Sequence, residues 1–366
     1  MKLLTCAAAM LAAISTAYGI VIRHDRPDSR YLELAKGHDE AVDIAGAMGT
    51  LIDKRWVLTA GHVGLELSPY TSFVRIKGRV YQADRVIIHP DFVKDGLPSG
   101  RDFTLMHLTE DVKGITPVGL YTGKDEQGQR ILVVGRGDTG TGLTGPTGND
   151  GKMRGAENKV DDASETSISF AFDEPGKALD LEGISGPGDS GGPALIQKNG
   201  RWWIVGVSSA NRGPKTCQYG SVEVYARVST AIDWIRSVMN GAATASSDWV
   251  KHTPFSGWQQ DRVGEICAAL VNSYNSPTVD AYEAFNQRYR DKEILGRRTP
   301  EQRATAWTNY REQYGDLEVL EYATRGDQVV SILTRSKKTH EKAVISVFLQ
   351  GQGADAVFEG WNIDPI

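Results

Sequence analysis

The chain has 366 residues, with 41 Lys and Arg against 46 Asp and Glu, a net charge of −5, and 40% apolar residues. At about 150 residues per domain, this length predicts about two folded domains. The composition is that of an ordinary globular protein, which excludes a wholly disordered or fibrous chain. A mildly acidic chain lacks the positive field that nucleic acids and anionic membranes normally attract, so neither partner is expected.

Residues 1–19 have the pattern of a secretory signal peptide. Lys2 gives a positive start, Leu3–Ile14 is an apolar run interrupted only by Thr5, and small residues follow. About 7–15 apolar residues suffice for a signal and are too few to span a bilayer, and no later segment is long and apolar enough to do so. Cleavage is predicted after Ala17 or after Gly19. The mature protein is therefore expected to be secreted, either outside the cell or into a periplasm.

The cysteines and histidines argue against a disulfide scaffold and against a structural metal. Only Cys217 and Cys267 remain once Cys6 leaves with the signal, and one bridge between them is an open alternative. The seven His are scattered, and no Cys or His pair has zinc-finger spacing. Neither a metal nor a cofactor is expected.

Residues 20–240 have the pattern of an all-β domain. Short apolar runs alternate with Gly, Pro and Asp, as is typical of a sandwich or barrel of many brief strands. One amphipathic helix closes the domain, with Ile232, Ile235 and Val238 at helical spacing and Ser229 or Thr230 as the expected cap. The expected strands are Gly49–Ile52, Trp56–Thr59, Val86–Ile88, Thr104–Leu108, Ile131–Gly135, Ile168–Phe172, Ala194–Ile196, Trp202–Ser208 and Val222–Val228.

The chain changes character near residue 240. Residues 241–257 are mostly small and polar and are predicted to be a linker. Over residues 258–366 helical patterns precede strand patterns, which predicts a separate, smaller α+β domain. The expected helices are Val263–Tyr274, Ser276–Tyr289 with Pro277 at its first position, and Thr299–Tyr310 with a capping box from Thr299 to Gln302. The expected strands are Leu317–Tyr322, Gln328–Leu333, Ala343–Leu349 and Ala356–Ile363.

The strongest chemical signal is the run from Gly186 to Pro193, GPGDSGGP. Its glycines free the backbone for unusual dihedral angles, so consecutive N–H groups can point at one oxyanion. Ser190 in such a turn can attack the carbonyl carbon that these donors hold. A plain glycine-rich turn is the alternative interpretation.

A serine nucleophile needs a base, and the base needs a carboxylate that orients it. His62 directly follows an apolar strand, and Asp102 precedes the strand Thr104–Leu108. Taken singly, such a His is more often structural and such an Asp is usually a turn residue. In the order His62, Asp102, Ser190, the three residues support one another as a catalytic set.

At this point the sequence resembles the trypsin/chymotrypsin-like serine proteases (S1-type) over roughly residues 20–240. The resemblance implies a mostly β fold of two packed six-stranded antiparallel β-barrels with the site in the cleft between them. The motifs that carry it are Gly49-Thr50-Leu51-Ile52, Thr59-Ala60-Gly61-His62, Asp102-Phe103-Thr104-Leu105, Gly135-Arg136-Gly137, Gly188-Asp189-Ser190-Gly191-Gly192-Pro193, Val205-Gly206-Val207-Ser208-Ser209 and Val224-Tyr225-Ala226-Arg227-Val228.

The resemblance also implies the roles of individual residues. Ser190 would be the nucleophile, His62 the general acid and base, and Asp102 the residue that orients His62. The backbone N–H groups of Gly188 and Ser190 would form the oxyanion hole. Ser209 would lie beside Asp102 and begin the strand that pairs with the substrate.

Two further residues concern the substrate side chain before the cleaved bond, called P1. Ile184, six residues before Ser190, takes the place on the pocket floor where a trypsin carries Asp. Glu223 aligns with a small residue that lines the same pocket in most relatives. If Glu223 points inward, it would favour Lys or Arg at P1 by pairing with the cation, and a solvent-facing glutamate is the alternative.

Activation is implied by the same resemblance. In activated relatives a new amino terminus, usually Ile-Val, pairs with the Asp before the nucleophile, which is Asp189 here. Ile20 lies 42 residues before His62, close to the family separation. Cleavage after Gly19 would free Ile20, so signal removal would also activate the enzyme. Cleavage after Ala17, with activation by another route, is the alternative.

One stretch has a rival interpretation. Residues 131–140 form an apolar run followed by GxGxxG, a dinucleotide fingerprint that must open a helix. The following residues 141–146 (TGLTGP) cannot be helical, so nucleotide binding is not expected.

Two functions remain open. The first is a secreted serine endopeptidase that acts on a protein or peptide through an acyl-enzyme, and the alternative is a catalytically silent protease-like binding protein. The C-terminal domain resembles the cone-shaped NTF2-like domains appended to bacterial hydrolases, and its partner is unknown.

Overall fold

The computed structural model describes residues 19–148, 150–213, 216–241 and 249–366. These residues form two compact units, one of residues 19–67 and 72–241, the other of residues 249–366 with the short segment 68–71. Except for Gly19, the predicted signal peptide lies outside the described residues. Among the residues described, no helix is both long and apolar enough to cross a bilayer.

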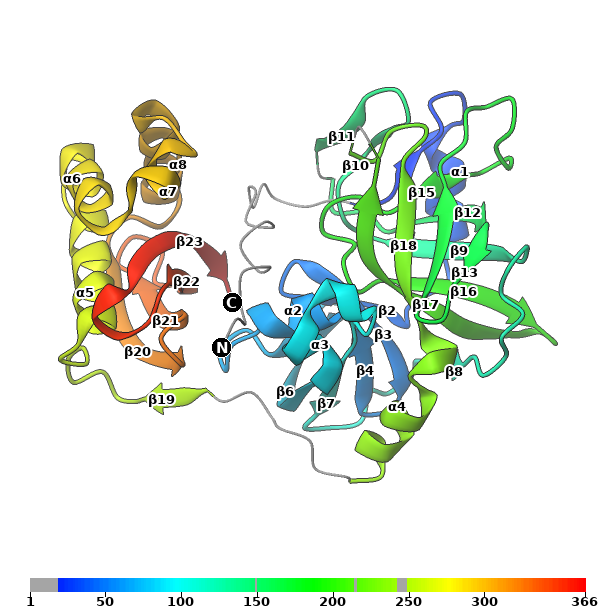
Figure 1. Ribbon diagram of the computed structural model, residues 1–366, viewed down its shortest axis with the longest axis horizontal. Coiled ribbons are helices and arrows are strands. Elements are labelled where there is room, and N and C mark those ends of the chain that lie inside the picture. Colours follow the sequence, from blue (N-terminus) through cyan, green and yellow to red (C-terminus); the bar gives the residue numbers. More distant parts are fainter. Residues whose placement is uncertain (1–18, 149, 214–215, 242–248) are drawn as a thin grey trace. The chain divides into compact units, whose positions relative to one another are not determined.

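The first half of the larger unit is a closed six-stranded barrel, drawn in blue and cyan in Figure 1, with strand order β2-β3-β4-β7-β6-β5. Closure leaves the sheet without an exposed edge, and inward-facing residues such as Leu51, Val57 and Leu105 are fully buried. The strands are β2 (Ala41–Ile44), β3 (Ala47–Asp53), β4 (Trp56–Thr59), β5 (Phe73–Ile76), β6 (Arg79–Ile88) and β7 (Thr104–Leu108).

The second half is an eight-stranded, mostly antiparallel sheet of order β12-β9-β16-β17-β18-β14-β13, with β8 added beside β17. The mostly β fold is confirmed, but this second barrel is a half-barrel, because the strand pairings of the described residues do not close it. Strands β1 (Val21–Ile22), β10 (Thr139–Thr141), β11 (Gly145–Gly148) and β15 (Gly183–Ile184) form a separate four-stranded sheet instead. The strands of the half-barrel are β8 (Gly119–Leu120), β9 (Arg130–Gly135), β12 (Arg154–Lys159), β13 (Asp162–Ala163), β14 (Ser167–Ala171), β16 (Pro193–Lys198), β17 (Arg201–Arg212) and β18 (Val222–Arg227).

The glycines of the GxGxxG stretch serve packing rather than nucleotide binding. The residues that follow β9 form strand β10, so no helix begins there. A Cβ atom at Gly135 would lie 2.1 Å from the Asp189 Oδ1 atom, and one at Gly137 would lie 2.4 Å from the Asp189 backbone nitrogen. Only glycine allows the chain to approach Asp189 this closely.

The larger unit carries four short α-helices among its described residues: α1 (Asp28–Leu34), α2 (Gly61–Glu66), α3 (Pro90–Asp95) and α4 (Ile232–Met239). The closing helix α4 was predicted correctly, but its expected cap was wrong. Ser229 Oγ donates to Glu126 at 2.8 Å, and Thr230 Oγ1 donates to the Arg227 carbonyl at 2.8 Å. Because both hydroxyls are engaged in this way, Ala231 stands at the N-cap without a side-chain bond.

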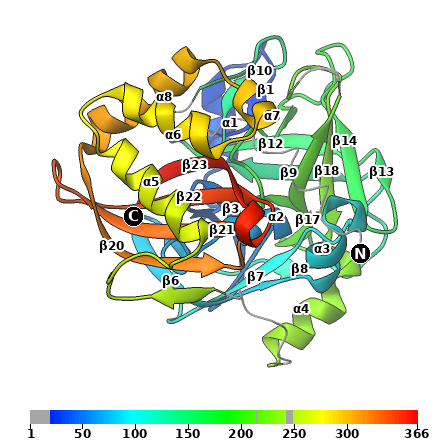
Figure 2. The ribbon, with the colours of Figure 1, turned by 60° about the vertical axis from the view of Figure 1, so that its left-hand side comes forward.

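The smaller unit is an antiparallel five-stranded sheet of order β19-β20-β21-β22-β23. Figure 2 shows its helices layered over the sheet, and the apolar residues between helices and sheet form a core of their own. The strands are β19 (Val250–His252), β20 (Leu317–Arg325), β21 (Val329–Ser336), β22 (Lys342–Gln350) and β23 (Val357–Pro365). The helices are α5 (Arg262–Tyr274), α6 (Val279–Tyr289), α7 (Lys292–Gly296) and α8 (Pro300–Tyr314).

Most sequence predictions for this unit match these elements. The capping box between Thr299 and Gln302 is present at the start of α8. Pro277, however, precedes α6, because Thr278 keeps an extended backbone and caps a helix that begins at Val279. Strand β19 lies inside the predicted linker 241–257, and α7 was not predicted. The open alternative of a Cys217–Cys267 bridge is not formed, since both are free buried thiols.

Candidate active site

Asp102 and His62 meet although they are 40 residues apart. Strands β4 and β7 pair with Thr59 opposite Thr104, so the residues that follow β4 lie beside those that precede β7. His62 Nδ1 is 2.9 Å from Asp102 Oδ2, and the His62 backbone N–H donates to Asp102 Oδ1 at 2.8 Å. The two contacts fix the ring and leave its Nε2 atom for another partner.

The Asp102 carboxylate is buried, with 1% of its surface exposed, and it has a third donor. Ser209 Oγ, on β17, donates to Asp102 Oδ2 at 2.6 Å. A buried carboxylate is stable only when its oxygens accept hydrogen bonds, and these three contacts meet that need. The structure thus brings the predicted residues His62, Asp102 and Ser209 together.

The environment of His62 suits a general base. Burial lowers the pKa of the imidazole, but the negative charge of Asp102 and its hydrogen bond outweigh this effect, with a further contribution from Glu66. The net result is a pKa of His62 above its ordinary value. Its side chain is still 22% exposed, so a substrate can reach it.

Ser190 is held beside the segment that leads to His62. Its carbonyl accepts from the Met48 N–H at 2.8 Å, which joins the nucleophile turn to the first barrel. The next residue, Gly191, has φ +82°, and a Cβ atom there would lie 2.0 Å from Thr59 Oγ1 and 3.0 Å from the Ala60 nitrogen. Among the described residues no hydrogen bond joins Ser190 to His62, which is common in free enzymes because such bonds tighten with substrate.

Two backbone N–H groups close to Ser190 in the chain have no acceptor among the described residues. Asp189 donates to the Gly186 carbonyl, Gly191 to the Ser208 carbonyl and Gly192 to the Asp189 carbonyl. By contrast, the N–H groups of Gly188 and Ser190 donate no hydrogen bond within the described part of the chain. These are the two donors that the resemblance predicted.

Ile20 and Asp189 are in contact. The Ile20 N–H donates to Asp189 Oδ2 at 3.0 Å, and both residues are almost fully buried. The Gly186 N–H reaches the same oxygen at 2.9 Å, and the Gly137 N–H donates to Oδ1. Burial raises the pKa of Asp189 to about 6, although these donors act in the opposite direction.

Glu223 points inward, so the alternative of a solvent-facing side chain is wrong. It is 2% exposed, and its Oε1 atom accepts from Asn211 Nδ2 at 2.7 Å. Burial raises the pKa of Glu223 to about 8, the Asn211 hydrogen bond opposes this, and Asp189 adds repulsion. Ile184 is fully buried in β15, where it pairs with Val21.

Asn211 is a contact of the site that sequence reasoning missed. The strand predicted at Trp202–Ser208 continues to Arg212 in the structure, which places Asn211 opposite Glu223 on β18. The sequence could have shown this contact only if the strand had been extended beyond Ser208 with the same alternation of side chains. The polar residues after Val207 instead resemble the end of a strand.

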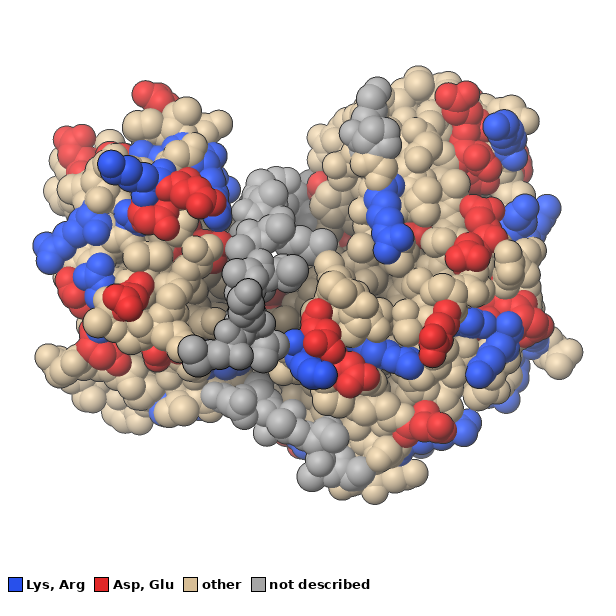
Figure 3. All heavy atoms as spheres, viewed as in Figure 1, with Lys and Arg blue, Asp and Glu red and all other residues tan. Residues whose placement is uncertain are grey.

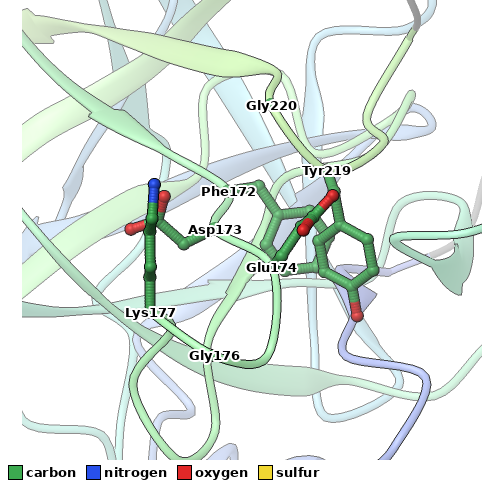
Figure 4. A pocket seen from close by; sticks show the side chains of 7 residues that line it. All are labelled: Phe172, Asp173, Glu174, Gly176, Lys177, Tyr219 and Gly220. Carbon is green, nitrogen blue, oxygen red and sulfur yellow. The ribbon is translucent and has the colours of Figure 1, made fainter.

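A described pocket lies elsewhere on this unit. It measures about 510 Å³, and Figure 4 shows the rings of Phe172 and Tyr219 in its wall, 4.7 Å apart. Asp173, Glu174 and Lys177 also line it, and none of the predicted site residues does. On the face drawn in Figure 3, Lys and Arg side chains are interspersed with Asp and Glu over this unit.

Comparison with known proteins agrees with this fold. A family model described as Trypsin matches residues 38–235, more than half of the chain, so the chain belongs to the trypsin family of serine proteases. It is 28% identical over 233 residues to a protein named Ovochymase from Halocynthia roretzi, covering 56% of this chain and 14% of that protein. It is also 28% identical over 234 residues to Complement C1s subcomponent from Sus scrofa, covering 55% of this chain and 33% of that protein. The chain thus spans a third or less of the length of these relatives.

Proposed function

We propose that the protein is a secreted serine endopeptidase that hydrolyses peptide bonds through an acyl-enzyme on Ser190. The observation that carries this proposal is the buried Asp102 carboxylate, which bonds the Nδ1 atom of the His62 ring and the His62 backbone N–H beside the turn that carries Ser190. Secretion rests on the signal-like pattern of residues 1–19.

The proposed reaction has two halves. Ser190 Oγ attacks the carbonyl carbon of the scissile bond while His62 Nε2 takes its proton, and the N–H groups of Gly188 and Ser190 stabilise the oxyanion. The C–N bond then breaks, and the leaving amine takes the proton from His62. Water attacks the resulting ester with His62 again as base, which releases the acid product and restores Ser190. Asp102 stays ionised and stabilises the imidazolium.

Glu223 supports a preference for Lys or Arg at P1, as its buried carboxylate would pair with a cation. The contact between Ile20 and Asp189 supports an activation step in which cleavage after Gly19 turns the Ile20 nitrogen into an ammonium group. We assign residues 20–240 to the protease domain and residues 258–366 to an accessory domain that binds a protein or stabilises the protease.

Labelling with a fluorophosphonate tests the proposal against a catalytically silent binding protein. The purified protein that contains both units and begins at Ile20 is expected to be labelled, and Ser190→Ala is expected to abolish labelling and to lower peptide hydrolysis by about 10³-fold or more. Ser164→Ala, which removes a hydroxyl from a surface turn of the same unit, serves as the control and is expected to label normally. A folded wild-type protein that is not labelled would support the binding protein instead.

A further inference from the structure

The Asn211–Glu223 pair lies next to the catalytic residues. Asn211 follows Ser209, the Asp102 partner, by two residues on β17, and it stands opposite Glu223 on β18. Glu223 and Tyr225 share one face of β18, since they are two residues apart in a strand. The Tyr225 hydroxyl bonds Ser185 in the segment that leads to Ser190, so this face of β18 looks toward that segment.

The two oxygens of the Glu223 carboxyl differ. Oε1 accepts from the Asn211 amide at 2.7 Å, whereas Oε2 has no hydrogen-bond partner among the residues described. Glu223 as a whole is 2% exposed, so little water reaches this oxygen, and a carboxyl oxygen with few partners is costly to bury. Asn211 itself is only partly buried. The pair therefore has one carboxyl oxygen, Oε2, that can accept a further hydrogen bond, while the Asn211 amide occupies Oε1.

Among the described residues, the groups that interact with Glu223 do not supply a cation. Asp189 is held by Ile20 and by backbone N–H groups, and Cys217, a buried free thiol, lies close enough for Glu223 to raise its pKa further. The Tyr225 hydroxyl bonds Ser185. The raised pKa of Glu223 is consistent with a carboxyl that still lacks a positive partner. A substrate side chain can provide one.

We propose that Asn211 is a second specificity-determining residue, which makes the enzyme favour Lys over Arg at P1 by occupying one oxygen of Glu223. This inference rests on the proposed endopeptidase function and narrows its substrate class. An ammonium group is a point charge that binds the single free oxygen Oε2. A guanidinium group binds a carboxylate best through both oxygens at once, and Asn211 blocks that arrangement.

The test measures kcat/KM for a matched series of peptide amides that differ only at P1, with Lys, Arg, norleucine and citrulline. The full-chain protein is used, and active sites are counted by fluorophosphonate labelling so that misfolded protein does not enter the rates. Wild type is expected to cleave the Lys substrate about tenfold faster than the Arg substrate, and faster than both neutral ones. Asn211→Ala frees Oε1 and is expected to bring the Lys-to-Arg ratio to about one or below.

Two variants keep the result interpretable. Glu223→Gln preserves the size of the side chain and is expected to remove the advantage of both cations over their neutral counterparts. Gln197→Ala removes an amide from an exposed position of the same unit and is expected to leave the ratio unchanged. If Asn211→Ala folds poorly, Asn211→Leu, which is close to Asn in size and carries no donor, provides the same test.

Three results would overturn the inference. These are an Arg preference in wild type, a Lys-to-Arg ratio that Asn211→Ala and Asn211→Leu leave unchanged, and equal cleavage of cationic and neutral substrates. Each of them is seen only in an enzyme that turns over. Loss of all labelling and all hydrolysis in the folded wild type would instead reject the endopeptidase function itself, so the two failures are distinct.

Discussion

Three buried carboxyl groups in the larger unit differ in the hydrogen-bond donors around them, and this difference bears on the role that each can have. Asp102 accepts from the His62 ring, the His62 backbone and the Ser209 hydroxyl, which suits a permanent anion that orients a base. The Asp189 carboxylate accepts hydrogen bonds from backbone N–H groups only, and it could also pair with a charged amine. Glu223 has one neutral amide, and its pKa rises to about 8 because burial outweighs that bond. The group with the fewest hydrogen bonds of the three, Glu223, is the one that we propose binds the substrate side chain.

Asp102→Asn is expected to change the pH profile as well as the rate. Activity requires neutral His62, so kcat/KM rises as pH rises through the pKa of His62, which Asp102 holds above its ordinary value. Without the Asp102 carboxylate, burial is opposed only by the smaller effect of Glu66, so the pKa of His62 falls. The acidic limb of the profile is therefore expected at lower pH, with kcat reduced by about 10⁴-fold.

The chain provides a matched control for this measurement. Asp84 and His107 form an exposed pair with a 2.6 Å contact in the same unit. Asp84→Asn is expected to leave the profile unchanged. An acidic limb that stays in place in Asp102→Asn would contradict the assigned role of Asp102.

At the scale of elements, the sequence predicted what depends on local pattern. Strands such as Ile131–Gly135 and the capping box of α8 follow from apolar alternation and from residues close in the chain. Strand β19 was missed because its three residues are stable only through their pairing with β20. The cap of α4 was wrong because Glu126, 103 residues from Ser229, binds that hydroxyl. Such partners are not visible in a local window.

The same distinction applies to the site. Ser190, His62 and Asp102 were predicted because each stands in a short motif. Asn211 lacks a motif of its own, and its importance arises from the register that places it opposite Glu223. Register depends on strand pairing across the whole sheet, which a single sequence does not reveal.

The segment that begins at Ile20 is expected to carry the activation switch. Sequencing of the active protein is expected to start at Ile20, whose ammonium group would pair with Asp189. Pairing raises the pKa of the amine above its free value of about 8, so the pair is intact below that raised pKa and is lost as pH rises through it. Activity is therefore expected to fall on the alkaline side, where His62 no longer titrates.

Asp189→Asn is expected to lower kcat/KM by about tenfold or more at neutral pH and to remove the alkaline limb. Asp180→Asn is the control, because it removes an exposed carboxylate that binds Arg26 and Arg30 of the same segment. This variant is expected to keep the alkaline limb of the pH profile. An active protein that starts at Tyr18 would rule out this switch.

At the scale of the whole molecule, the two units have separate cores. Apolar side chains between α5, α6, α8 and the five-stranded sheet form the core of the smaller unit. The barrel and half-barrel of the larger unit enclose two other clusters. Because each unit buries apolar residues of its own, each has the means to fold as a domain.

Separate cores predict separate unfolding, which calorimetry of the full chain can resolve as two transitions. Phe358 in the smaller unit and Leu105 in the barrel are both fully buried, so truncation of either to Ala should cost about 2–5 kcal/mol in its own unit. Phe358→Ala is expected to lower the transition temperature of the smaller unit. It is not expected to change the temperature at which fluorophosphonate labelling is lost. Leu105→Ala is expected to lower the other transition together with that labelling temperature. If either substitution shifts both transitions equally, the units unfold as one and the division into two domains is wrong.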